Sequence, residues 1–288
     1  MTGRDGNSRA AIVPNPPILY GTAWKQERTQ PLVERAIELG FRGVDTAAQP
    51  KHYDEAAVGR AIAALIARGV VARDALYVQT KFTPYPGQDP LRVPYDPKAP
   101  LAAQVAQSFA SSLENLQTDY VDSLVLHSPM RDAESLAEVW TAMEAIAEEG
   151  AARQLGISNC YSLAYLEHLW STAKIKPAVV QNRFYAATGY DVDVRSFCAE
   201  HGMVYQSFWT LTANAELLAS PELLRPAARL GRTPAQILFR YLAHEGVVPL
   251  TGTQSEAHMR EDLAIFEFEL RADERDAIAG RLGDKNRV

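Results

Sequence analysis

Residues 40–59, GFRGVDTAAQPKHYDEAAVG, pass from a short apolar run into a sequence of helical period. The run 41–47 is typical of a buried strand, and residues 54–68 are typical of an amphipathic helix. Asp45 lies near the end of the predicted strand, and Tyr53 lies just before the predicted helix. A strand followed by a helix is the unit of parallel α/β folds, and its recurrence along a chain predicts that architecture.

The same unit recurs along the whole chain. Residues that favour helix starts and ends support these helices. In one of them, Pro234 follows Thr233 at the first helical position, and Gly246 ends the helix. The predicted strands cover residues 18–23, 41–47, 76–81, 121–128, 153–159, 178–184, 203–208 and 247–252. The predicted helices cover residues 29–39, 54–68, 100–116, 134–149, 162–172, 192–201, 233–245 and 256–265, with a tail helix at 272–281.

Eight strands that alternate with eight helices predict parallel pairing through right-handed crossovers, in either a closed barrel or an open doubly wound sheet. No GxGxxG motif follows a predicted strand, and the 288 residues contain no low-complexity linker. A (β/α)8 TIM barrel, which typically has ~250 residues, fits these observations better than an open sheet. We therefore expect a flexible N-terminal segment over residues 1–17 and a single α/β barrel domain over residues 18–288, with a short C-terminal tail.

Composition and charge argue against several classes of protein. The chain has 29 Lys and Arg against 35 Asp and Glu, for a net charge of −6, and its cations are spread along the sequence. This distribution disfavours binding to nucleic acid or to an anionic membrane. Cys160 and Cys198 lack the spacing of a metal site, and no apolar run reaches transmembrane length. We expect a cytoplasmic protein that binds no metal ion.

Polar side chains stand at the ends of several predicted strands. Asp45, Lys81 and His127 lie near the ends of the second, third and fourth strands. Ionised groups beside apolar runs are costly unless they are paired. Taken singly, Asp45 fits a helix cap, Lys81 a flanking charge and His127 a hydrogen-bonded core residue. If a barrel closes, all three meet Tyr53 at one rim, where barrel enzymes carry their chemistry.

Together these residues suit the protonation of an oxygen on which negative charge builds. A phenol has a pKa of ~10, and we expect Lys81 to lower the pKa of Tyr53 while Asp45 keeps Lys81 charged and oriented. A neutral His127 would orient a carbonyl oxygen beside the phenol. The set therefore predicts one half of a carbonyl reduction, the donation of a proton.

The other half needs a hydride source, and here the chain resembles the aldo-keto reductases. The motifs GVDTA with a following tyrosine, QTK, LHSP, LGISN and VVQNRF occur in this order, and the resemblance extends from about Ile18 to the tail helix. Members of that family are (β/α)8 barrels that use a nicotinamide dinucleotide, usually NADPH. The resemblance implies that Tyr53 is the general acid, that Lys81 and Asp45 assist it, and that His127 orients the carbonyl.

The resemblance also implies sites for the nicotinamide and for a small-molecule carbonyl substrate. Ser158, Asn159 and Gln181 would hold the nicotinamide carboxamide. Phe208 stands where the family stacks an aromatic ring on the nicotinamide, and stacking needs only a π face. Trp24 matches a position that often lines the substrate pocket, and the long segments after the third and seventh strands supply further candidates. The residues expected to line the substrate pocket are Trp24, Tyr85, Tyr95 and Trp209.

The end of the eighth strand departs from the family. Many relatives place a lysine and an arginine there on the 2′-phosphate of the cofactor, whereas this chain has Thr253 and His258 in that region. The hydroxyl of Thr253 and the first amides of the helix at 256–265 would bind phosphate instead. Asp262 matches a position that contacts adenine. We expect NADPH as the cofactor, with NADH as an alternative, and a monomer or weak oligomer.

Two other functions remain open from the sequence. A cofactor-binding regulatory protein of the same fold would keep these residues but show little turnover. A metal-dependent barrel hydrolase would use Asp45, His52 and His127, although no HxH motif or second carboxylate stands at a strand end. A reductase remains the leading hypothesis.

Overall fold

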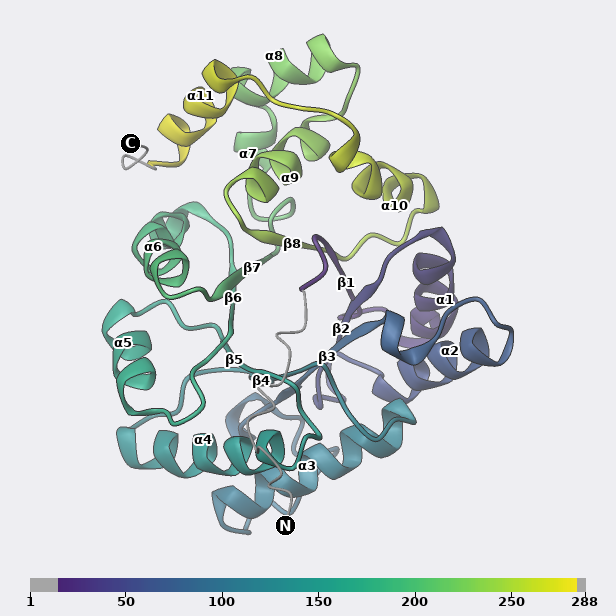
Figure 1. The fold of residues 1–288 in the computed structure, drawn as a ribbon, viewed down its shortest axis with the longest axis vertical. Coiled ribbons are helices and arrows are strands. Elements are labelled where there is room, and N and C mark those ends of the chain that lie inside the picture. The colour runs from purple at the N-terminus through teal and green to yellow at the C-terminus, as the bar shows by residue number, and fades with distance from the viewer. Residues whose placement is uncertain (1–14, 284–288) are drawn as a thin grey trace, which may run out of the picture.

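The computed structural model describes residues 15–283 and shows a closed barrel of eight parallel strands in the order of the chain, surrounded by helices (Figure 1). The predicted (β/α)8 TIM barrel is confirmed. The strands are β1 (Leu19–Gly21), β2 (Gly43–Asp45), β3 (Tyr77–Phe82), β4 (Ser123–Leu126), β5 (Leu155–Ser158), β6 (Val179–Arg183), β7 (Val204–Phe208) and β8 (Val248–Thr251). The helices are α1 (Thr29–Leu39), α2 (Glu55–Ala67), α3 (Leu101–Leu116), α4 (Ala133–Glu148), α5 (Leu163–Thr172), α6 (Val192–Glu200), α7 (Ala215–Leu218), α8 (Pro221–Leu230), α9 (Pro234–His244), α10 (Glu256–Leu263) and α11 (Ala272–Leu282).

Closure of the barrel pairs the first strand with the last strand at one seam. Tyr20 of β1 pairs with Val44 of β2 on one side and with Thr251 of β8 on the other. Because every pair is parallel, all eight carboxyl ends open at the same rim. The main core lies between the strands and the helices, and a smaller cluster fills the barrel itself. That inner cluster consists of Leu19, Tyr77, Val248 and Leu250, with Val204 and Phe208 packed against it.

The segment between β7 and α9 contains two helices that the sequence pattern did not predict. Residues 209–222 read as a long connection, but α7 forms within it and α8 begins at its end. The two helices pack against each other and against α9. In Figure 1 they lie with α11 outside the ring, beyond β8. Helix propensity does not predict α8, because Pro226 in its interior lacks a backbone donor. The buried Leu223 and Ala227 compensate by packing α8 against its neighbours.

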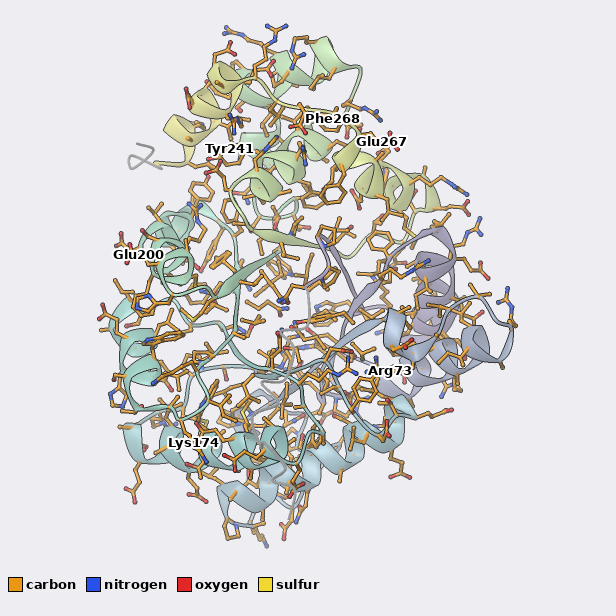
Figure 2. The ribbon with its side chains drawn as sticks, viewed as in Figure 1. Arg73, Lys174, Glu200, Tyr241, Glu267 and Phe268 are labelled. Carbon is orange, nitrogen blue, oxygen red and sulfur yellow. The ribbon has the colours of Figure 1, made fainter. Side chains whose placement is uncertain are left out.

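The outer surface of the helical ring is charged. Figure 2 shows the side chains of Lys174, Glu200 and Glu267 at the periphery, and all three residues are exposed. None of the described helices combines the length and the apolar character needed to cross a membrane. Residues 1–14 of the expected N-terminal segment lie outside the described residues. Within the remainder of that segment, the Asn15 Oδ1 atom accepts a hydrogen bond of 3.3 Å from Gln154.

Helices α2 and α3 approach so closely that only glycine fits at one point. A Cβ atom on Gly59 would lie 2.1 Å from the carbonyl oxygen of Asn115 and 2.8 Å from the backbone of Leu116. We expect Gly59→Ala to destabilise the protein by about 1–3 kcal/mol, measured by denaturant unfolding, because the helices must move apart.

Gly280 in α11 provides the matched control. No atom lies within 4 Å of a Cβ placed there. Gly280→Ala should therefore stabilise the protein by about 0.5–1 kcal/mol through helix propensity alone. If both substitutions changed stability in the same direction, close packing at Gly59 would not explain the glycine.

Candidate active site

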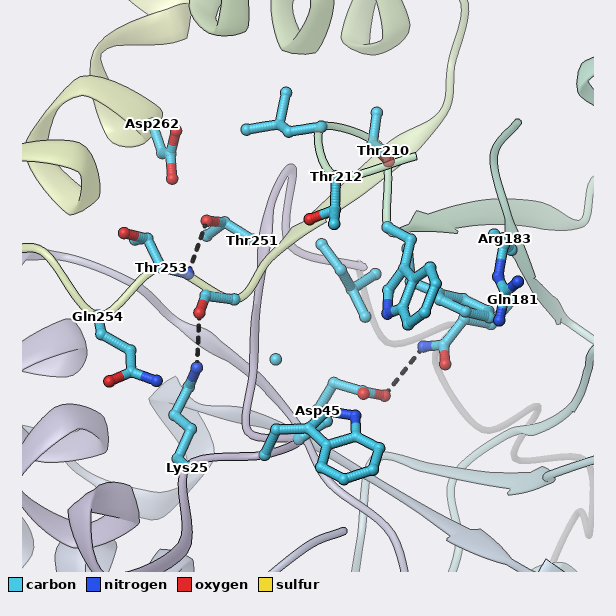
Figure 3. A pocket seen from close by; sticks show the side chains of 18 of the residues that line it. Lys25, Asp45, Gln181, Arg183, Thr210, Thr212, Thr251, Thr253, Gln254 and Asp262 are labelled. Atoms are coloured by element: carbon cyan, nitrogen blue, oxygen red, sulfur yellow. Dashed lines mark hydrogen bonds between the residues drawn. The ribbon is translucent and has the colours of Figure 1, made fainter. Parts of the chain in front are cut away.

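A cavity of about 770 Å³ opens at the carboxyl ends of the strands and gathers most of the predicted site (Figure 3). Its size is within the range of small-molecule and cofactor sites. Lys81 does not line this cavity; its side chain is buried against Asp45, which does. The predicted residues that line the cavity are Trp24, Asp45, Tyr53, His127, Ser158, Asn159, Gln181, Phe208, Trp209, Thr253, His258 and Asp262.

Asp45 and Lys81 form a buried ion pair at the ends of β2 and β3. The Lys81 Nζ atom lies 2.7 Å from both carboxylate oxygens of Asp45 and donates a third hydrogen bond, of 2.8 Å, to the Thr46 carbonyl. An ammonium group has three donors, so all of them are used. Burial lowers the pKa of Lys81, and the charge of Asp45 opposes that shift. These contacts hold the Lys81 side chain in one orientation.

Tyr53 lies beside this pair, but its pKa moves in the opposite direction to the expected one. The Lys81 Nζ atom is 5.3 Å from the centroid of the Tyr53 ring. Burial raises the pKa of Tyr53, and the negative charge of Asp45 raises it further. Desolvation of the phenolate thus exceeds any stabilisation by Lys81, whose donors already bind Asp45 and Thr46. The expected lowering was wrong, and Tyr53 keeps its proton at neutral pH.

His127 lies across from Tyr53 at the end of β4. The two rings meet edge to face with centroids 6.0 Å apart, and the His127 Nδ1 atom lies 2.7 Å from the Thr83 hydroxyl. Burial lowers the pKa of His127 well below its usual value, and the positive charges of Lys81 and His52 add to the effect. His127 is therefore a neutral imidazole held in a fixed orientation.

A chain of amides connects Asp45 to the other side of the barrel. Gln79 and Gln181 donate hydrogen bonds of 2.7 and 2.9 Å to the Asp45 Oδ1 atom. Both also donate to the Gln206 Oε1 atom, at 2.8 and 2.9 Å. Ser158 donates to the backbone carbonyl of Gln181. These bonds fix the polar floor of the cavity in one arrangement.

Three residues that line the cavity have left-handed backbone conformations, which are uncommon for tryptophan and less so for asparagine. Trp24, Asn159 and Trp209 adopt φ angles of 63°, 56° and 56°. Such left-handed geometry costs a non-glycine residue about 1–3 kcal/mol, and it tends to occur at functional sites. Trp24 and Trp209 are also 58% and 47% exposed. The structure thus places two large aromatic side chains at the mouth of the cavity despite strain and exposure.

The end of β8 is surrounded by cations from the β1–α1 connection. Lys25 is only 3% exposed, and its Nζ atom donates a 2.6 Å hydrogen bond to the Gly252 carbonyl. Burial lowers the pKa of Lys25 to about 8, and the charge of Arg28 contributes. Arg28 donates to the Gln254 side chain at 2.6 Å. These two cations therefore lie beside the strand end at which the sequence lacks the usual lysine and arginine.

Other polar side chains of this region come from the loop before α10 and from α10 itself. The Thr253 hydroxyl accepts a hydrogen bond from the Ser255 amide and lies 3.5 Å from the His258 Nδ1 atom. Asp262 is 4% exposed, and its burial raises its pKa to about 6. The structure therefore brings together the three residues that were expected to contact the far end of a dinucleotide.

Two tyrosines expected in the pocket lie elsewhere. Tyr85 is 45% exposed and is not part of the cavity lining. Tyr95 is buried and donates a 2.8 Å hydrogen bond to the Thr83 carbonyl, to which Gln88 also donates. The connection after β3 therefore folds back onto its own start. His52, which precedes Tyr53 in the sequence, packs against Trp24 with ring centroids 3.8 Å apart and ring planes inclined by 36°.

Two cationic residues of the lining were not predicted, namely Lys25 and Arg183. Arg183 ends β6, so the rule that selected Lys81 at the end of β3 also applies to it. Lys25 follows Trp24 directly in the sequence. Among residues 15–283, no group of three or more His, Cys, Asp or Glu is arranged to hold a metal ion. Asp45, His52 and His127 therefore do not form the site that the hydrolase hypothesis requires.

Comparison with known proteins identifies the family to which the chain belongs. The model of the aldo/keto reductase family matches residues 18–217. An aldo-keto reductase of Mycobacterium bovis is 32% identical over 100% of this chain and 96% of its own length. A glyoxal reductase of Bacillus subtilis is 30% identical over 85% of this chain and 80% of its own. The crystal structure of an aldo/keto reductase of Brucella melitensis has a TM-score of 0.78 and 27% identity, over 93% of this chain and 95% of that one. The chain described here therefore belongs to the aldo/keto reductase family.

Proposed function

We propose that the protein reduces an aldehyde or ketone to an alcohol with NADPH, with Tyr53 as the general acid. The observation that carries this proposal is that Asp45, Tyr53 and His127 line one cavity, with the buried Lys81 paired to Asp45 beside the phenol. Burial keeps the proton on Tyr53, and the adjacent Lys81 is the cation that would stabilise the phenolate once the proton has been transferred.

The residues of the cavity fit a nicotinamide dinucleotide. Phe208 presents an aromatic ring at the end of β7, next to Arg183 of β6. Ser158, Asn159 and Gln181 offer amide and hydroxyl groups for a carboxamide. At the other end of the cavity, the buried Lys25 has no carboxylate partner among the described residues, so an anion is needed to compensate its charge. A phosphate of the cofactor meets that need, with Thr253, His258 and Asp262 around the adenosine.

When bound, NADPH supplies the hydride that reaches the carbonyl carbon. The chain's own residues then handle the oxygen. His127 holds the carbonyl oxygen, and Tyr53 transfers its phenolic proton to that oxygen as negative charge develops. Lys81 stands within 5.3 Å of the ring to stabilise the phenolate that remains. Trp24 and Trp209 cover the mouth of the cavity and limit the access of water.

Oxidation of NADPH with a panel of aldehydes and ketones tests this function. We expect consumption of the cofactor with at least one of them and formation of the matching alcohol. Tight binding of NADPH without oxidation on any member of the panel would favour the regulatory protein instead. The reductase proposal would then fail, whereas the fold and the cofactor site would remain.

Lys25 should decide the preference for NADPH over NADH. We expect Lys25→Met to weaken NADPH binding about tenfold and NADH binding much less, because charged hydrogen bonds typically contribute about 1.5–3 kcal/mol. In the natural chain, NADPH affinity should fall as the pH rises through about 8, since Lys25 then loses its proton. Fluorescence titration at several pH values measures both effects.

Lys98→Met, an exposed substitution outside the cavity lining, is the control for the loss of one lysine. It should leave both affinities and the pH profile unchanged. An equal loss of NADPH and NADH binding in Lys25→Met would mean that Lys25 does not recognise the 2′-phosphate.

A further inference from the structure

Arg183 is a cation of the cavity lining that lacks an acidic partner. Its guanidinium group contacts two aromatic rings, with its central carbon 4.0 Å from the centroid of Trp209 and 5.3 Å from that of Tyr185. Its buried Nε atom has no hydrogen-bond partner among the described residues. No carboxylate of residues 15–283 forms an ion pair with it. Arg183 is partly buried and lines the cavity, so its uncompensated charge favours an anionic ligand there.

The other charges of the lining do not compensate Arg183. Asp45 is paired with Lys81 and also accepts hydrogen bonds from two glutamines. The remaining carboxylates, Glu261 and Asp262, belong to α10 and its end of the cavity. Figure 3 shows Arg183 beside Gln181, on the opposite side of the cavity from Lys25 and Asp262. The cavity therefore has one cation at each side, Lys25 and Arg183, and neither forms an ion pair with a carboxylate of the described residues.

The packing of Arg183 also suits the recognition of an anion. The guanidinium lies over the Trp209 ring, and its two Nη groups make no hydrogen bond among the described residues. Such a pair of donors can bind a carboxylate in a bidentate manner. The backbone around it is fixed, because its amide donates a 3.2 Å hydrogen bond to the Tyr161 hydroxyl and β6 pairs Arg183 with Phe208. A guanidinium group that is already held in place loses little conformational entropy when it binds an anion.

We propose that Arg183 binds a carboxylate of the substrate, so that the preferred substrates are carbonyl compounds bearing an acid group. This inference rests on the proposed reductase function and narrows its substrate class. Arg183 lies two residues beyond Gln181 on the same strand, at the side of the cavity that would hold the nicotinamide and thus the reacting carbonyl. Lys25, at the other side, is left for the cofactor's phosphate.

Matched pairs of acids and esters test the inference directly. The probes are 4-carboxybenzaldehyde with its methyl ester, and succinic semialdehyde with its methyl ester. We expect the natural protein to show a higher kcat/KM for each acid. Arg183→Met should reduce the acid-to-ester ratio about ten- to hundredfold, in line with the loss of a charge-assisted pair. The loss should fall mainly on KM, because the carboxylate is the same in ground and transition states.

Two further variants separate charge from structure. Arg183→Lys keeps the charge but not the fork, so it should restore part of the ratio. Arg68→Met removes an exposed arginine of the α2 end, outside the cavity lining, and should keep the full ratio. If Arg183→Met and Arg68→Met gave the same ratio, Arg183 would not recognise the substrate.

NADPH titration of Arg183→Met distinguishes the substrate from the cofactor as the source of the anion. Binding that is unchanged within about twofold supports the substrate assignment. A tenfold or greater loss would assign Arg183 to the diphosphate of the cofactor and overturn the inference. If the natural protein oxidised NADPH with neither acids nor esters, the proposed reductase function itself would fail, and this result is distinct from equal turnover of both.

Discussion

Tyr53→Phe is expected to bind NADPH as the natural chain does and to lose about 10²–10⁴-fold in kcat, the contribution typical of a positioned proton donor. The substitution removes one hydroxyl and keeps the ring that packs against His127 and Lys81. Because the phenol holds its proton in the buried site, its loss removes the donor without changing the charge of the cavity. The loss should therefore appear in kcat and not in cofactor affinity.

Tyr85→Phe is the matched control for this experiment. It makes the same chemical change on an exposed side chain outside the cavity lining. Turnover is measured with a carbonyl compound that the natural protein reduces, and NADPH affinity is measured by fluorescence titration. If Tyr53→Phe retained turnover near that of Tyr85→Phe, the proton would have to come from another group, and the proposed role of Tyr53 would be wrong.

Asp45→Asn should have the largest effect on stability, with a loss of about 3–5 kcal/mol in the free energy of unfolding. The carboxylate receives hydrogen bonds from Lys81, Gln79 and Gln181. An amide cannot neutralise the buried ammonium group, and its NH2 group faces donors instead of acceptors. Lys81 would then be a buried charge without a counter-ion, and that state is more costly than the loss of one interaction.

A double variant separates the ion pair from the general effect of a substitution in the core. Asp45→Leu with Lys81→Met removes both charges and should recover much of the stability that Asp45→Asn loses. Denaturant unfolding of the natural chain, the single variants and the double variant gives the coupling energy. A single Asp45→Asn variant within about 0.5 kcal/mol of the natural chain would show that the pair is not needed for stability.

The sequence predicted the barrel and most of its site because both follow from local periodicity. The end of each apolar run indicates the carboxyl end of a strand. In a parallel barrel those ends lie at the same rim regardless of how the helices pack. Asp45, Tyr53 and His127 could therefore be placed together from their positions alone. The position of Lys25 beside the eighth strand could not be predicted in this way. The contact between Lys25 and Gly252 joins residues 227 positions apart, and no local pattern indicates it.

Burial and loop paths explain the other differences. The pKa of Tyr53 depends on how completely the fold excludes water, so an argument from neighbouring charges gave the wrong direction. Tyr85 was placed in the pocket because it follows a strand end, but Gln88 and Tyr95 tie that connection back to Thr83. Helix α8 was missed because Pro226 breaks the expected pattern while tertiary packing sustains the helix.

The glutamine side chains beneath the cavity all have defined amide orientations, and the charge of Asp45 determines them. A carboxylate only accepts hydrogen bonds, so Asp45 compels Gln79 and Gln181 to turn their NH2 groups toward it. The Oε1 atom of Gln181, on a side chain that lines the cavity, is thereby left without a donor among the described residues. A ligand amide placed beside Gln181 would donate its NH2 group to this oxygen. The site therefore favours one of the two orientations of such an amide. Asp45 thus sets the orientation of the Gln79 and Gln181 amides in addition to being the counter-ion of Lys81.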